Sequence, residues 1–68
     1  MIILFINGKS RNFEQNSITV ANLVQILGLE GKRLAIELNG SIVSRGSFEQ
    51  TVLKSDDKLE IVGAVGGG

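Results

Sequence analysis

The residues best suited to chemistry lie at the end of the sequence, where Gly63-Ala64-Val65-Gly66-Gly67-Gly68 follows an apolar run. Glycine lacks a Cβ atom, so this backbone can extend, adopt positive φ and enter a channel too narrow for side chains. An α-carboxylate on Gly68 is an anion at neutral pH, because such groups have a pKa of about 3.3–3.7. Although glycine-rich termini are commonly solvated tails, the pattern indicates a segment that delivers its terminal carboxylate.

Asp56, Asp57 and Glu60 form a second cluster of potential chemical groups. Carboxylates at this spacing could serve metal binding or acid–base catalysis, but adjacent aspartates before a strand are far more often turn formers. The sequence contains no Cys and no His, which leaves no thiol or imidazole nucleophile, no disulfide and no plausible zinc site. We therefore expect no catalytic residue, no metal site, no bound cofactor and no enzymatic activity in this chain alone.

The overall charge argues against nucleic acid as a partner. Seven basic and seven acidic residues give a formal net charge of zero, without the basic excess of nucleic-acid-binding domains. Three phenylalanines are the only aromatic residues, too few for a base-stacking surface. The apolar run at residues 2–6 has no basic segment before it and is too short for a signal peptide or a membrane span. A soluble cytoplasmic protein is the expectation.

Turn signals divide the remaining chain into short elements. An apolar run at 2–6 ends at Asn7-Gly8, a strong hairpin signal, and predicts a second strand at 9–13. The apolar spacing i, i+3, i+4, i+7 predicts a helix over 20–27, with Thr19 as N-cap, Ile18 and Leu23 as a hydrophobic staple, and Gly28 at its end. Strands are predicted at 34–38, 42–43 and 58–62, with an irregular segment at 44–55. The predicted order is ββαβββ.

A single helix can cover only one face of the sheet. The first strand is apolar on both faces, which is typical of a central strand with a parallel neighbour, and the last strand is its natural partner. Leu4, Ile6, Leu59 and Ile61 are then predicted to face the helix. Ile3 and Phe5, extended by Val62, are left on the open face as a candidate surface for binding partner proteins. The alternative is that residues 44–54 or a dimer partner cover them.

These features resemble the ubiquitin-like β-grasp sulfur carriers, and within that superfamily the ThiS family of thiamine biosynthesis. The resemblance covers the whole chain, and its most specific elements are the short length, the segment Leu53 to Val62 and the ending Ala64-Val65-Gly66-Gly67-Gly68. Two departures are visible: Ser44-Arg45 stands where the family often has Pro-Arg, and Asp56-Asp57 where it often has Gly-Asp. The implied fold is α+β, a β-grasp domain at 1–62 followed by a flexible tail at 63–68.

The resemblance also implies a function. An ATP-dependent, ThiF-like adenylyltransferase would join the Gly68 carboxylate to AMP, and a persulfide sulfur donor would convert it to a thiocarboxylate. A ThiG-like thiazole synthase would then take the sulfur. Gly66, Gly67 and Gly68 would enter the partner's active site.

Two alternatives remain open from the sequence. The small subunit of molybdopterin synthase uses the same fold and terminal diglycine in molybdenum-cofactor synthesis, although its sequences tend to be longer. A ubiquitin-like protein modifier or interaction module is the second alternative. Mass spectrometry distinguishes these possibilities. A terminal thiocarboxylate indicates a sulfur carrier, a lysine conjugate indicates a protein modifier, and neither product indicates an interaction module.

Overall fold

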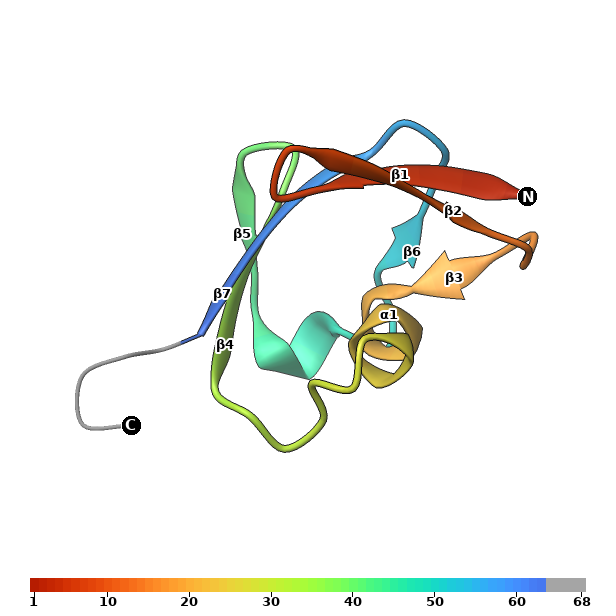
Figure 1. Cartoon of the computed structure of the whole chain (residues 1–68). Coiled ribbons are helices and arrows are strands. Elements are labelled where there is room, and N and C mark those ends of the chain that lie inside the picture. The colour runs from red at the N-terminus through yellow and green to blue at the C-terminus, as the bar shows by residue number, and fades with distance from the viewer. Residues whose placement is uncertain (64–68) are drawn as a thin grey trace.

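Five strands form the main sheet, which curves around one short helix (Figure 1). The computed structural model describes residues 1–63. The strands of this sheet follow the spatial order β2-β1-β7-β4-β5. Their bounds are β1 Ile2–Ile6, β2 Lys9–Phe13, β4 Leu34–Leu38, β5 Ser41–Val43 and β7 Lys58–Gly63. The helix α1 spans Val20–Ile26, and a 3₁₀ helix, η1, spans Arg45–Ser47.

The first and last strands pair in parallel at the centre of the sheet, as predicted. Phe5 is opposite Lys58 and Ile6 is opposite Leu59. The other pairings of the main sheet are antiparallel: β1 with β2, β4 with β5, and β4 with β7. The chain therefore brings β7, its last described strand, into the middle of the sheet. β7 includes Gly63, one residue more than the predicted strand.

A second, two-stranded sheet was not predicted. β3 (Ile18–Thr19) pairs antiparallel with β6 (Val52–Leu53). The backbone N–H of Val20 donates to Thr51 O at 2.9 Å, and that of Ala21 donates to Phe48 O at 3.0 Å. These contacts fasten the segment that the sequence indicated as irregular to the start of α1. Strands of two residues cannot be predicted from sequence patterns, because they are too short to show the alternation of apolar and polar residues that marks a strand.

The helix has well-formed caps at both ends. Thr19 Oγ1 accepts from the Asn22 N–H at 3.0 Å, and Asn22 Oδ1 accepts from the Thr19 N–H at the same distance, forming a capping box. Gly28 has φ +73° and donates to Gln25 O, while the Leu29 N–H donates to Val24 O. This Schellman motif confirms Gly28 as the stop signal. The helix ends at Ile26, with the predicted Leu27 serving as C-cap.

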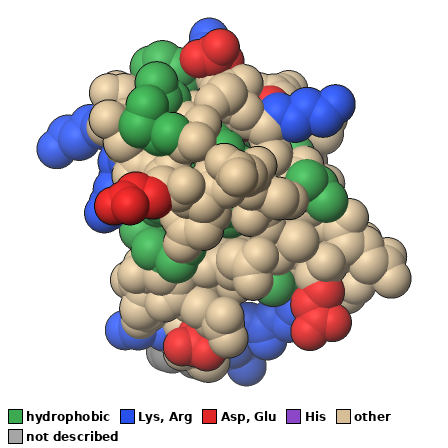
Figure 2. All heavy atoms as spheres, turned by 90° about the vertical axis from the view of Figure 1, so that its right-hand side faces the viewer, with side chains coloured by type: hydrophobic (Ala, Val, Ile, Leu, Met, Phe, Trp, Pro, Cys, Tyr) green, Lys and Arg blue, Asp and Glu red, His purple; other side chains and the backbone are tan. Residues whose placement is uncertain are grey.

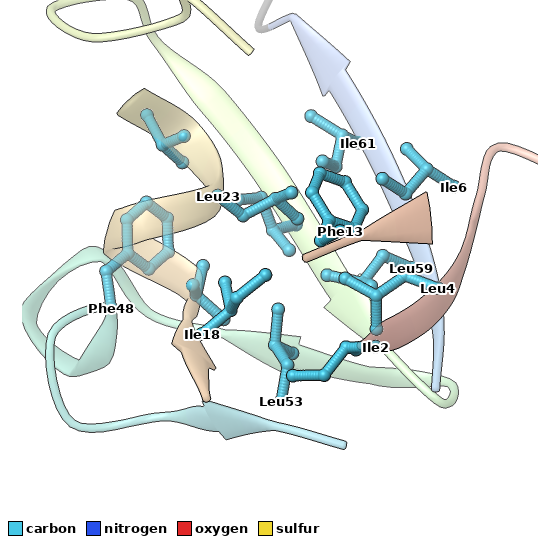
Figure 3. Packing of buried hydrophobic residues seen from close by; sticks show 13 residues of the cluster. Ile2, Leu4, Ile6, Phe13, Ile18, Leu23, Phe48, Leu53, Leu59 and Ile61 are labelled. Carbon is cyan, nitrogen blue, oxygen red and sulfur yellow. The ribbon is translucent and has the colours of Figure 1, made fainter. Parts of the chain in front are cut away.

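The core lies between the inner face of the sheet, the helix and residues 48–53 (Figure 3). Leu4, Ile6, Leu59 and Ile61 are buried there, which confirms the predicted face of β1 and β7. Phe48 and Leu53 join them, so residues 44–54 complete the core on the helix side. The alternative in which this segment covers the open face of the sheet is therefore wrong.

Charged side chains are dispersed on one face of the molecule. Figure 2 shows basic and acidic groups interspersed on the face that carries the N-terminal strands, without a large patch of one sign. Among residues 1–63, no helix is long and apolar enough to cross a membrane. The same residues contain no group of three or more carboxylates that could hold a metal ion.

Candidate functional site: the open face of the sheet and the strand that precedes the glycines

The open face presents the side chains that alternate with the core residues of β1 and β7. Ile3 and Phe5 are half-buried on β1, whereas Val62 on β7 is 55% exposed. The register places Phe5 beside Lys58 and Val62 beside Ala35 of β4. All three predicted residues lie on this face. Along β7, however, Glu60 lies between Val62 and Lys58, the residue beside Phe5. Val62 therefore belongs to a different part of the face from Ile3 and Phe5.

Ile42 is a further apolar residue of this face, and the sequence analysis missed it. It is 69% exposed and pairs with Glu37 across β4 and β5. The Asn39-Gly40 turn was the available signal, because a two-residue hairpin places Leu38 opposite Ser41 and therefore Glu37 opposite Ile42. Alternation along the predicted strand 34–38 already assigned Glu37 to the outer face.

The strand that precedes the terminal glycines is held from both sides. On one side it pairs with β4 as far as Gly63, which is opposite Leu34. On the other side Asn7 Nδ2 donates to Ile61 O at 3.0 Å, and the Ile61 N–H donates to Asn7 Oδ1 at 2.7 Å. The amide side chain thus continues the β1–β7 ladder beyond the end of β1. The predicted site residues Gly66, Gly67 and Gly68 lie outside the described residues.

Asp56 and Asp57, in the turn that precedes β7, have a structural role. Asp56 adopts φ +75°, a left-handed conformation that Asp tolerates better than most residues. Asp57 Oδ2 accepts from the Lys54 N–H at 2.8 Å, and Asp57 Oδ1 accepts from Asn39 Nδ2 at 3.0 Å. These bonds confirm the interpretation of Asp56-Asp57 as turn formers and show why Asp replaces Gly here without disrupting the turn.

The other departure, Ser44-Arg45, is accommodated by the 3₁₀ helix. Ser44 is its N-cap residue, and the Ser44 and Ser47 hydroxyls lie 3.1 Å apart. The Arg45 guanidinium donates to Lys32 O at 2.8 Å, which ties η1 to the loop before β4. The 3₁₀ helix lies on the same side of the sheet as α1, so it does not cover the open face (Figure 1).

The mixed sheet, the parallel central pair and the single helix on one face define a ubiquitin-like β-grasp protein. The model of the ThiS family matches residues 4–68. The chain therefore belongs to the ThiS family.

Individual relatives agree with this assignment. The chain is 32% identical over 66 residues to the sulfur carrier protein ThiS of Bacillus subtilis, covering 97% of this chain and 100% of the relative. It superposes on the crystal structure of the thiamine biosynthesis protein ThiS from Geobacter metallireducens with a TM-score of 0.87 and 30% identity, covering 98% of this chain and 100% of the other.

A different kind of relative contains a matching segment within a longer protein. The thiazole synthase of Paramagnetospirillum magneticum is 45% identical over 65 residues, which are 96% of this chain and 20% of the relative. The thiazole synthase of Magnetococcus marinus matches over the same shares at 37% identity. The chain thus spans about a fifth of the length of these two relatives.

Proposed function

We propose that the chain is a sulfur carrier of thiamine biosynthesis that transports sulfur as a thiocarboxylate on Gly68. The observation that carries the proposal is the family match, which extends from residue 4 through the terminal glycines to residue 68. The name of the Bacillus subtilis relative, sulfur carrier protein ThiS, supports it. The absence of Cys from the sequence leaves no side-chain thiol for a persulfide, so the terminal carbonyl is the available attachment point.

The loading chemistry takes place in partner enzymes. A carboxylate is a poor electrophile, so an adenylyltransferase first transfers AMP from ATP to a Gly68 carboxylate oxygen and releases pyrophosphate. The terminal sulfur of a persulfide then attacks the acyl carbon and AMP leaves. A thiol cleaves the remaining S–S bond and frees the thiocarboxylate. Glycine at positions 67 and 68 allows the reacting carbonyl to enter a narrow active site.

The folded domain provides the binding surface for the partner enzymes, because glycines have no side chains with which to bind them. Glycine residues lose more conformational entropy than other residues when a partner's active site orders them. Binding energy from the open face, through Ile3, Phe5 and Val62, offsets that loss. The acceptor is proposed to be a thiazole synthase, because two relatives with that name contain a segment matching this chain. The same relatives favour thiamine over molybdenum-cofactor synthesis.

Intact-mass spectrometry tests the proposal. The chain is incubated with an adenylyltransferase, ATP and a sulfide source, alongside an established carrier as positive control. We expect the mass increase of one oxygen-to-sulfur exchange, located at Gly68 by fragmentation. An unchanged mass under conditions that convert the control carrier would refute the proposal, and a lysine conjugate would identify a protein modifier instead.

A further inference from the structure

Two carboxylates face each other across neighbouring strands at the centre of the open face. Glu60 of β7 is directly opposite Glu37 of β4, and both side chains are exposed. Residues directly opposite in an antiparallel pair have Cβ atoms about 4.5–5.5 Å apart, and like charges in such positions are destabilising. The free domain therefore carries a local electrostatic repulsion that its fold does not require.

The surroundings of this pair are apolar on two sides. Ile42, 69% exposed, is opposite Glu37 on β5, and Val62, 55% exposed, follows Glu60 on the same face of β7. Lys58 lies two residues before Glu60 on that face and supplies one positive charge. The centre of the face thus combines two carboxylates, one ammonium group and exposed aliphatic side chains.

This combination is complementary to an arginine within an apolar contact surface. A guanidinium presents several N–H donors in one plane and can bond two carboxylates at once, whereas a lysine ammonium acts as a point charge. Aliphatic neighbours exclude water from such a contact and strengthen it. Removal of the repulsion between Glu37 and Glu60 adds to the gain on binding.

We propose that Glu37 and Glu60 form the specificity contact of the open face and receive an arginine of the thiazole synthase. This inference rests on the proposed function. Thiazole synthase is the selected partner because a segment like this chain is part of the same polypeptide in two relatives of that name. Glu60 also lies on the strand that leads to the glycines, so at most roughly 28 Å of extended backbone separates it from Gly68.

The test compares two double variants that change the net charge equally. Glu37→Gln/Glu60→Gln removes the pair, and Glu30→Gln/Glu49→Gln removes two exposed carboxylates outside the main sheet. Each chain is titrated into purified thiazole synthase by calorimetry at low and at moderate salt. We expect the first variant to bind at least about tenfold more weakly and with a smaller salt dependence. The control variant should bind within about twofold of the wild type, because distant surface charges act weakly in salt.

Two further measurements separate this inference from the proposed function. Urea denaturation should show the Glu37→Gln/Glu60→Gln chain to be at least as stable as the wild type, so that weaker binding is not unfolding. Thiocarboxylation by the adenylyltransferase should stay at the wild-type rate in the control variant, and in the Glu37→Gln/Glu60→Gln chain it should fall by less than the affinity for the synthase. If the wild type is never thiocarboxylated, the proposed function fails, while the titration still decides whether the carboxylate pair binds the synthase.

Three outcomes would overturn the inference. The first is wild-type affinity in the Glu37→Gln/Glu60→Gln chain, and the second is an equal loss of affinity in the control variant. The third is a loss of thiocarboxylation without a loss of synthase binding, which would assign the pair to the adenylyltransferase.

Discussion

The side chain of Asn7 bonds both backbone groups of Ile61, accepting from its N–H at 2.7 Å and donating to its C=O at 3.0 Å. The amide takes the place of a peptide group in the parallel ladder, at the point where β1 has ended and β7 continues toward the glycines. Asn39 acts similarly at the other end of β7, where its Oδ1 accepts from the Lys58 N–H at 2.9 Å. Both asparagines have positive φ, +51° and +50°.

Asn7→Gly isolates the contribution of this side chain, because glycine adopts the same positive φ without strain. The loss of two hydrogen bonds should lower the free energy of unfolding by about 1–3 kcal/mol in urea denaturation. Asn7→Ala should be less stable than Asn7→Gly by roughly a further 1 kcal/mol, since a Cβ atom is disfavoured at this φ. Equal stability of the wild type and Asn7→Gly would show that the contact contributes nothing.

Substitutions at two neighbouring positions of β1 should have opposite effects. Leu4 is fully buried, so Leu4→Glu places a charge in the core and should unfold a domain whose total stability is of order 5–15 kcal/mol. Phe5 points to the open face, so Phe5→Glu should leave the domain folded while weakening the binding of a partner enzyme. Circular dichroism and a binding titration check the pair, and an unfolded Phe5→Glu chain would contradict the proposed role of Phe5.

Glu60→Arg should raise stability and lower affinity together. The new guanidinium lies opposite Glu37 and replaces a repulsion with a cross-strand attraction, for a gain of roughly 0.5–1 kcal/mol in the free energy of unfolding. The same guanidinium should repel the arginine expected on the thiazole synthase, so the affinity should fall. Denaturation midpoints and titrations on one preparation measure both effects. A variant that binds the synthase as tightly as the wild type would contradict the assignment of Glu60 to that contact.

Deletion of Gly68 should separate stability from function. Terminal residues generally make few contacts, so the urea midpoint should stay within about 0.5 kcal/mol of the wild type, while thiocarboxylate formation is lost. Gly67→Val should bind the adenylyltransferase but react slowly, because a β-branched side chain restricts the backbone beside the reacting carbonyl. Intact mass over time measures both variants. Thiocarboxylation of the chain that lacks Gly68 would exclude this residue as the carrier site.

Local sequence signals determined most of the main elements and their faces. The Asn-Gly turns, the apolar stripe after Thr19, and Gly28 define elements through contacts between residues close in sequence. Such contacts follow from turn chemistry and helical periodicity alone. The two-sided apolar character of β1 identified its parallel partner, because a central strand is buried on both faces.

Tertiary structure alone decided the contacts between distant residues. The pairing of β3 with β6 depends on segments too short to carry a pattern. The Asn7–Ile61 bonds join residues far apart in sequence. They form because β7 extends past the end of β1 within the folded sheet, which brings Ile61 beside Asn7. The register between β4 and β7 determined that Glu37 faces Glu60 and that Val62 faces Ala35. A shift of that register by one residue would move every side chain of β7 to the other face, so the composition of the open face is a property of the folded sheet.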